Sequence, residues 1–106
     1  MTELEYINEF QKRKSSELTE ETISLINQAV KDYPNSEKLW ILRGDLLQLI
    51  DVEIGIPLEE SLNSYKRALE INPDSSEANF EMASFLNNVL DQTEKAHMFY
   101  QKAKNA

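Results

Sequence analysis

Apolar residues recur along most of the chain at intervals of three and four, the spacing of one face of an α-helix. Ile23, Ile26 and Val30 follow this spacing in one segment, and Leu58 and Leu62 begin it in another. No segment has the sustained alternation of apolar and polar residues that predicts a β-strand. The pattern therefore predicts an all-α fold. The six expected helices span residues 2–14, 19–33, 36–50, 58–71, 75–89 and 92–105.

Two prolines mark similar turns between these helices. Pro34 and Pro73 each follow a helical pattern and precede a short run of Asn, Asp or Ser residues that ends in Glu. Proline ends a helix because it has no N–H group and biases the residue before it away from the α conformation. The polar residues that follow can cap the next helix, and Asp74 with Glu77 has the spacing of a capping box. We expect the same helix–turn–helix arrangement at both places.

The second helix of each predicted pair repeats a pattern of small, large and small residues. A helix that packs closely against two neighbours needs small residues where the backbones approach, and a large residue between them. The matching positions are Thr22, Ile26 and Ala29, then Ser61, Tyr65 and Ala68, then Ala96, Tyr100 and Ala103. The repetition predicts three helical hairpins in a single domain, over residues 2–34, 36–73 and 75–106.

The first helices of the pairs repeat more loosely. Trp40 and Gly44 in one helix have Asn79 and Ala83 as counterparts in the next. Glycine inside a helix costs about 1 kcal/mol relative to alanine, so we expect Gly44 to lie in close contact with its partner helix. We also expect Trp40 to be largely buried. The other expected core residues are Tyr65, Ala68, Leu69, Met82, Leu86 and Tyr100.

These residues resemble the tetratricopeptide repeat, a helical hairpin of about 34 residues with Trp, Leu, Gly and Tyr in its first helix, then Ala, Phe and a closing Pro. The resemblance covers nearly the whole chain as three repeats. Pro34 and Pro73 are 39 residues apart, which implies about five extra residues relative to the family's repeat length. These lie in the apolar segment 51–57, which either folds back onto the hairpin or offers a second contact. The resemblance implies a short right-handed superhelix of stacked hairpins that binds other proteins.

The family's usual binding site is the concave face, which the first helix of each repeat lines. Matched through Trp40 and Gly44 and their counterparts, the expected groove residues are Lys38, Ile41, Asp45, Gln48 and Leu49, then Phe80, Ser84, Asn87 and Asn88. Ile41 and Phe80 would offer apolar pockets, and Gln48 and Asn87 could pair with a peptide backbone. The alternative is that Ile41 and Phe80 are partly buried by neighbouring helices.

One known activity of the family is not expected. Family members that hold the C-terminal carboxylate of heat-shock chaperones use Lys and Asn at positions of this groove. Ile41, Asp45 and Phe80 stand there in this chain.

The charge of the chain narrows the class of partner. With 19 acidic and 11 basic residues the net charge is −8, which disfavours binding to nucleic-acid phosphates. Acidic charge steers basic partners, although it also simply keeps a helical surface soluble. No apolar stretch approaches the roughly 20 residues of a membrane-spanning helix, and the acidic N-terminus is unlike a signal peptide. We therefore expect a cytoplasmic protein without membrane insertion.

Candidate catalytic chemistry is sparse. There is no cysteine, and His97 is the only histidine, so no second His or Cys can share a metal with it. The acidic pairs Glu20–Glu21 and Glu59–Glu60 fall in the first turns of helices, where negative charge complements the helix dipole. Nucleotide-binding and nucleophile motifs are also missing from the sequence. We expect no enzymatic activity, no cofactor and no metal.

The sequence thus predicts a protein-interaction module that acts as an adaptor or scaffold for another protein or peptide. The alternative function is that of a dedicated chaperone or inhibitor of one partner, such as a secretion chaperone or a toxin immunity protein. Met98, Phe99 and Tyr100 in the last helix leave a homodimer open as well.

Overall fold

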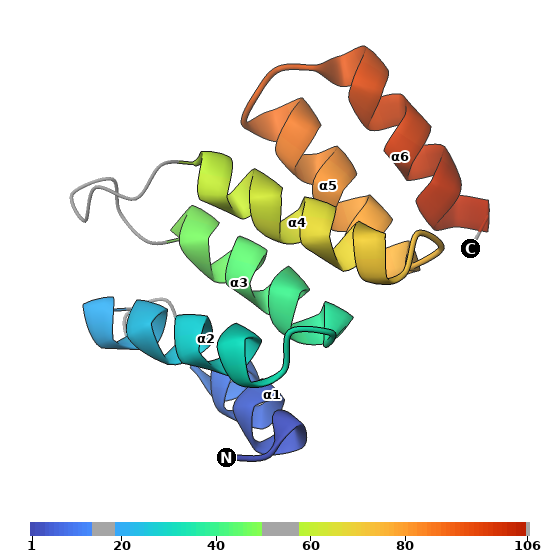
Figure 1. Cartoon of the computed structure of the whole chain (residues 1–106). Coiled ribbons are helices and arrows are strands. Elements are labelled where there is room, and N and C mark those ends of the chain that lie inside the picture. The colour runs from blue at the N-terminus through green and yellow to red at the C-terminus, as the bar shows by residue number, and fades with distance from the viewer. Residues whose placement is uncertain (14–18, 50–57, 106) are drawn as a thin grey trace.

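The computed structural model describes residues 1–13, 19–49 and 58–105, and over these it contains six α-helices and no strand (Figure 1). The helices are α1 (Glu3–Lys12), α2 (Glu20–Asp32), α3 (Glu37–Leu49), α4 (Glu59–Ile71), α5 (Ser76–Asn88) and α6 (Thr93–Asn105). The all-α prediction is confirmed, and the described helix ends lie within two residues of the expected ones. The segment 51–57 lies outside the described residues. None of the six helices combines the length and the apolar character of a membrane span.

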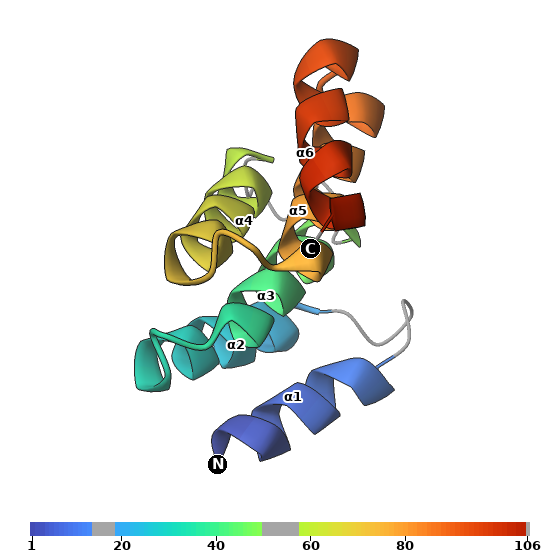
Figure 2. The same ribbon diagram turned by 90° about the vertical axis from the view of Figure 1, so that its right-hand side faces the viewer.

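The helices pack mainly against their neighbours in sequence. α3 packs along α4, and α5 along α6, as two hairpins (Figure 1). α2 packs against α3, and α4 against α5, which joins the units into one array. α1 lies beside α2 and α3 but packs less closely than the helices of the two hairpins do (Figure 2). Because α3 also touches both α1 and α5, the first helices of successive pairs lie next to one another.

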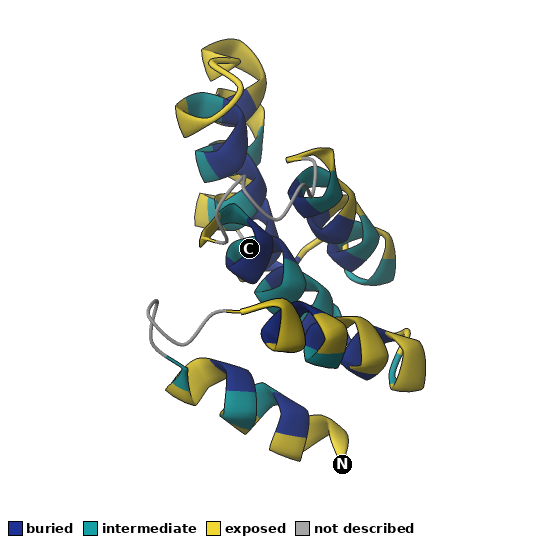
Figure 3. Cartoon of the chain, turned by 90° about the vertical axis from the view of Figure 1, so that its left-hand side faces the viewer, coloured by how far each residue is buried: buried dark blue, intermediate teal, exposed yellow. Residues whose placement is uncertain are grey.

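The buried residues lie along the facing sides of the helices (Figure 3). One cluster joins α1, α2 and α3, a second joins α4, α5 and α6, and a third lies between them around Ile41. Of the residues expected in the core, four are buried and two are partly buried. The buried ones are Tyr65, Ala68, Met82 and Leu86, and the partly buried ones are Leu69 and Tyr100.

The two proline turns carry the same helix cap. Ser36 Oγ accepts a hydrogen bond from the Leu39 N–H at 3.3 Å, and Ser75 Oγ accepts one from the Ala78 N–H at 3.1 Å. The two serines are 39 residues apart, the spacing of the two prolines. Asp74, which we expected to cap α5, instead lies in the turn, where its N–H donates to Asn72 Oδ1 at 3.2 Å. The serine one residue further on is the cap because its backbone is extended there and its hydroxyl reaches the first free N–H groups of the helix.

Trp40 and its counterpart Asn79 have different side chains, but each donates a hydrogen bond to the carbonyl of the proline six residues before it. Trp40 Nε1 donates to the Pro34 carbonyl at 2.9 Å, and Asn79 Nδ2 donates to the Pro73 carbonyl at 3.1 Å. Trp40 is partly buried and packs against two of the core clusters. Its indole reaches outward to the turn, and the Arg43 guanidinium lies over its ring at 5.9 Å.

Gly44 lies against the fully buried ring of Tyr65. A Cβ atom built on Gly44 would lie 2.5 Å from Tyr65 Cε1 and 2.7 Å from Cζ. This is closer than non-bonded carbon atoms approach, so α3 and α4 come together as they do only because residue 44 has no side chain. The close contact expected at this glycine is confirmed.

Gly44→Ala should therefore lower the free energy of unfolding. Alanine gains about 1 kcal/mol of helix propensity, but overpacking a well-filled core costs roughly 1–3 kcal/mol. We expect a net loss of about 1 kcal/mol in chemical denaturation. Ala83 holds the same position in the next hairpin and is fully buried, so the reverse change, Ala83→Gly, should also destabilise. A Gly44→Ala protein more stable than the wild type would contradict this packing.

Candidate functional site

The exposed side of α3 and α5 carries most of the residues expected to bind a partner. We call this surface the α3–α5 face. It comprises Lys38, Asp45, Gln48, Glu77, Phe80, Glu81, Ser84 and Asn87. Lys38 on α3 forms an ion pair with Glu77 on α5, which ties the two helices together across this face. The one basic group of the α3–α5 face is thus already paired with a carboxylate.

Ile41 does not belong to this face. Its side chain is 1% exposed and packs in the cluster with Ala68 of α4 and Ala78 of α5. The small side chains of these two alanines let α4 and α5 pack closely against Ile41. The expectation that Ile41 lines a groove is wrong, and the alternative of burial by neighbouring helices holds.

Phe80 is the residue 39 positions after Ile41, and its surroundings are the opposite. It is 52% exposed, and its ring meets Tyr100 of α6 edge to face with the centroids 5.8 Å apart. In the described part of the chain, no helix packs over the end of the array where α5 and α6 lie. Phe80 is therefore a large apolar group that is held in place on one side and open on the other.

Asp45 and Gln48 are bound by the hydroxyl of Tyr65. Tyr65 Oη donates to Asp45 Oδ1 at 2.6 Å and accepts from Gln48 Nε2 at 2.5 Å. Burial raises the pKa of the Tyr65 hydroxyl above its ordinary value, so it remains a proton donor. Gln48 therefore donates an amide hydrogen to Tyr65 within the chain. We had expected this amide to pair with the backbone of a bound peptide.

Glu81 joins this cluster from α5 and was missed by the sequence analysis. Its carboxyl group lies near that of Asp45, close enough for each group to shift the pKa of the other, and the two share a site. Burial, and then the nearby charge of Asp45, raises the pKa of Glu81 to about 7. Burial raises the pKa of Asp45 as well, against the hydrogen bond from Tyr65. The sequence signal that could have identified Glu81 is its i, i+4 spacing from Glu77, which places both residues on one side of α5.

The next hairpin repeats the tyrosine contact in a weaker form. Tyr100 Oη lies 3.4 Å from Ser84 Oγ, and Ser84 follows Asp45 by 39 residues. Asn87 accepts a hydrogen bond from Thr93 Oγ1 at 3.1 Å and donates one to Asn88 at 3.2 Å. Asn87 thus supports the turn between α5 and α6, and a change at this residue would affect the fold as well as the surface.

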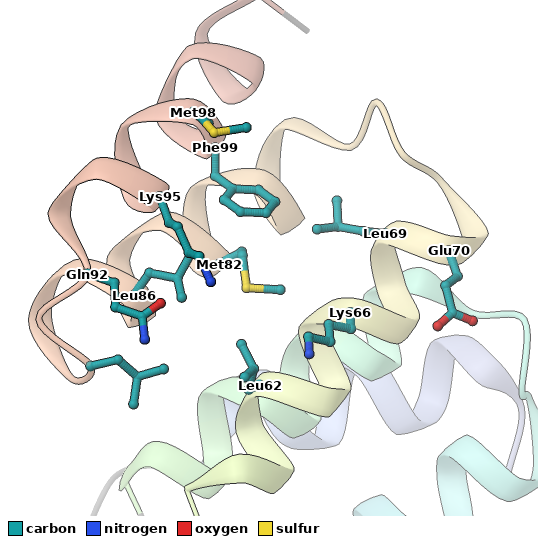
Figure 4. Close-up of a pocket in the computed structure, with 11 residues that line it drawn as sticks. Leu62, Lys66, Leu69, Glu70, Met82, Leu86, Gln92, Lys95, Met98 and Phe99 are labelled. Carbon is teal, nitrogen blue, oxygen red and sulfur yellow. The ribbon is translucent and has the colours of Figure 1, made fainter.

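A second surface lies between α4 and α6, with α5 as its floor (Figure 4). This cleft has a volume of about 700 Å³. Its floor and walls are apolar, and Lys66 and Lys95 lie on opposite walls. Met98 and Phe99, which the sequence suggested only as a dimer contact, both line this cleft.

Metal-ligating groups do not gather in the part of the chain that the structure describes, where no three His, Cys, Asp or Glu side chains could hold an ion together. His97 is exposed on α6, and its Nε2 lies 3.4 Å from the Gln101 amide.

The raised pKa of Glu81 beside Asp45 predicts a pH-dependent stability. Because the pKa of Glu81 is raised in the folded protein, its protonation stabilises the fold below the unfolded-state pKa, and this contribution is lost as the pH rises through about 7. Glu81→Gln, which mimics the protonated group, should raise the melting temperature at about pH 8 and leave it nearly unchanged at about pH 5. Glu70→Gln, an exposed control, should show no such difference. A change in melting temperature for Glu81→Gln that is the same at both pH values would contradict the shared site.

The comparisons with known proteins agree with this architecture. The family model of the tetratricopeptide repeat matches residues 64–98, from the second half of α4 through α5 into α6. No curated protein matches the chain. Repeats of this family are non-catalytic and generally mediate protein–protein interaction. The matched segment and the six described helices together support a tetratricopeptide-type repeat within an all-α array of hairpins.

Proposed function

We propose that the chain is a protein-interaction module that holds a basic segment of a partner protein on the α3–α5 face. The observation that carries this proposal is the exposed ring of Phe80 on a face with three carboxylates and one lysine. Phe80 is braced by Tyr100, and its free side is available to a partner. Exposed aromatic residues of this kind supply much of the binding energy of protein interfaces.

The charges beside Phe80 favour a basic partner. Glu77 and Glu81 lie within one helical turn of Phe80 on α5, and Asp45 lies beside Glu81. Lys38 is the only cation of the α3–α5 face and is paired with Glu77. A lysine or arginine of the partner would find carboxylates nearby and an aromatic ring on which its cationic group can rest.

The raised pKa of Glu81 makes the strength of this attraction depend on pH. Near pH 7 the shared site of Asp45 and Glu81 is close to its titration. Loss of the proton adds negative charge to the α3–α5 face, so a basic segment should bind more tightly above pH 7 than below it. High salt should weaken binding because it screens exposed charges.

Phe80→Ala should weaken partner binding and leave the fold nearly intact. Truncating an aromatic anchor costs roughly 2 kcal/mol of binding energy, while a half-exposed ring contributes little to the core. The measurement is capture of proteins from an extract of the source cell on the immobilised chain, with melting curves for each variant. Met98→Ala is the matched control, since Met98 is 61% exposed and lies on the other surface.

Proteins with basic segments should be captured by the wild type and by the Met98→Ala variant, and lost with Phe80→Ala. Several such proteins would indicate an adaptor, and a single one a dedicated chaperone or inhibitor. Capture that is unchanged by Phe80→Ala would refute the proposed face. A large drop in melting temperature for that variant would instead assign Phe80 to the core.

A further inference from the structure

The array contains the same kind of cleft twice, once between α2 and α4 over α3, and once between α4 and α6 over α5. We call these the first cleft and the second cleft. Residues of α2 and α3 correspond to those of α4 and α5 at an offset of 39, the spacing of the two proline turns. Residues of α4 correspond to those of α6 at an offset of 35, which matches Tyr65 with Tyr100. The two clefts can therefore be compared position by position.

The first cleft is bridged by side chains of the chain itself. Arg43 on its floor donates through Nε to Asn27 Oδ1 at 2.9 Å and through Nη1 to Ser64 Oγ at 2.7 Å. The same guanidinium lies 3.5 Å from the Glu60 carboxylate. One wall of the first cleft thus supplies an amide and the other a carboxylate, and the arginine between them satisfies both.

The second cleft has an apolar floor at the same place. Met82 takes the position of Arg43, and Leu86 continues the floor along α5. Leu62 and Leu69 line the α4 wall, and Phe99 lines the α6 wall (Figure 4). No long polar side chain bridges these walls among the described residues, so the second cleft stays open.

The walls of the second cleft carry two lysines where the first has an amide and a carboxylate. Lys66 takes the position of Asn27, and Lys95 takes the position of Glu60. Neither lysine forms an ion pair with any residue that the structure describes. Lys66 lines the first cleft as well, so the exchange of Glu60 for Lys95 is the charge difference between corresponding positions of the two clefts.

The surroundings add to this positive charge. Glu70 is the acidic residue that lines the second cleft, and it already pairs with Arg67 at 3.2 Å. Lys102 lies over the ring of Phe99 at 5.5 Å. In a chain with a net charge of −8, the second cleft is thus a local basic and apolar surface, opposite in charge to the α3–α5 face.

The side chains at the mouth of the second cleft show that it is open along its length. Met98 is 61% exposed and Leu90 is 36% exposed, although both line the cleft. An enclosed pocket for a small ligand would bury its lining, whereas these apolar groups need an extended partner to cover them. Two helical walls and a helical floor match the groove that receives an amphipathic helix.

We propose that the second cleft binds an amphipathic helix of a partner protein, with its apolar face toward Met82 and Leu86 and acidic residues along both edges. Carboxylates on the two edges would pair with Lys66 on one wall and Lys95 on the other. This surface is separate from the α3–α5 face and takes a partner segment of the opposite charge.

The test measures binding of a fluorescent synthetic peptide to the full chain by anisotropy. The probe is a helix-favouring peptide with leucines at i, i+4 and i+7 and glutamates on both edges of that face. A second probe has lysines in place of the glutamates. The acidic probe should bind, and the basic probe should bind at least about tenfold more weakly, because like charges would meet on both walls.

Charge reversal in the protein should exchange the two preferences. Lys66→Glu with Lys95→Glu should weaken the acidic probe at least about tenfold and strengthen the basic one. The matched control is Lys31→Glu with Lys104→Glu, which changes the net charge equally at exposed lysines away from the second cleft. It should leave the preference for the acidic probe in place. Phe80→Ala should not affect this probe, which separates the proposal from that for the α3–α5 face.

Four outcomes would overturn the proposal. The first is an acidic probe that does not bind. The second is binding that the Lys66 and Lys95 reversal and the control reversal of Lys31 and Lys104 weaken equally. The third is competition by dodecanoate with the same dependence on Lys66 and Lys95 while neither peptide binds, which would assign the second cleft to a small amphiphile. The fourth is a dimer in sedimentation that Met98→Glu dissociates, which would assign it to a second copy of the chain.

Discussion

The contact between the Tyr65 ring and Gly44 is the constraint on which the rest of the array depends. The ring is fully buried and lies where the side chain of any other residue at position 44 would be. Its hydroxyl then holds Asp45 and Gln48 on α3, and Asp45 in turn meets Glu81 on α5. One side chain of α4 therefore sets the distance to α3 and the polar contact between α3 and α5.

The second consequence of this packing is that each pair of neighbouring hairpins encloses a cleft on the side away from the α3–α5 face. A single residue on the floor decides whether the two walls of such a cleft are bridged. Arg43 bridges the first cleft to Asn27 and Ser64, whereas Met82 leaves the second cleft open. The same backbone arrangement thus gives one cleft whose walls Arg43 bridges and one whose walls no described side chain bridges. The chain presents an acidic face and a basic cleft, and each favours a partner of the opposite charge.

The helices and the close approach at Gly44 could be predicted because they depend on local spacing and on one costly glycine. Exposure could not be predicted in the same way. Ile41 and Phe80 hold the same position in successive hairpins, and one is buried and the other open, because only Ile41 has a further hairpin packed over it. Glu81 was missed because its pKa is raised by burial and by a carboxyl from another helix, and neither is visible in the local sequence. The second cleft was missed because its lysines have the pattern of an ordinary solvated surface.

The difference in unfolding free energy between two hydroxyl deletions, at Tyr65 and at Tyr100, tests most directly the polar contact by which Tyr65 holds α3. Tyr65→Phe leaves the partly buried Asp45 and Gln48 groups without their hydrogen-bond partner, which costs about 1–3 kcal/mol. Tyr100→Phe removes only the 3.4 Å contact with Ser84, and should cost about 0.5 kcal/mol or less. Chemical denaturation of the two variants should therefore show the larger loss for Tyr65→Phe. Equal losses, or a larger one for Tyr100→Phe, would contradict the account.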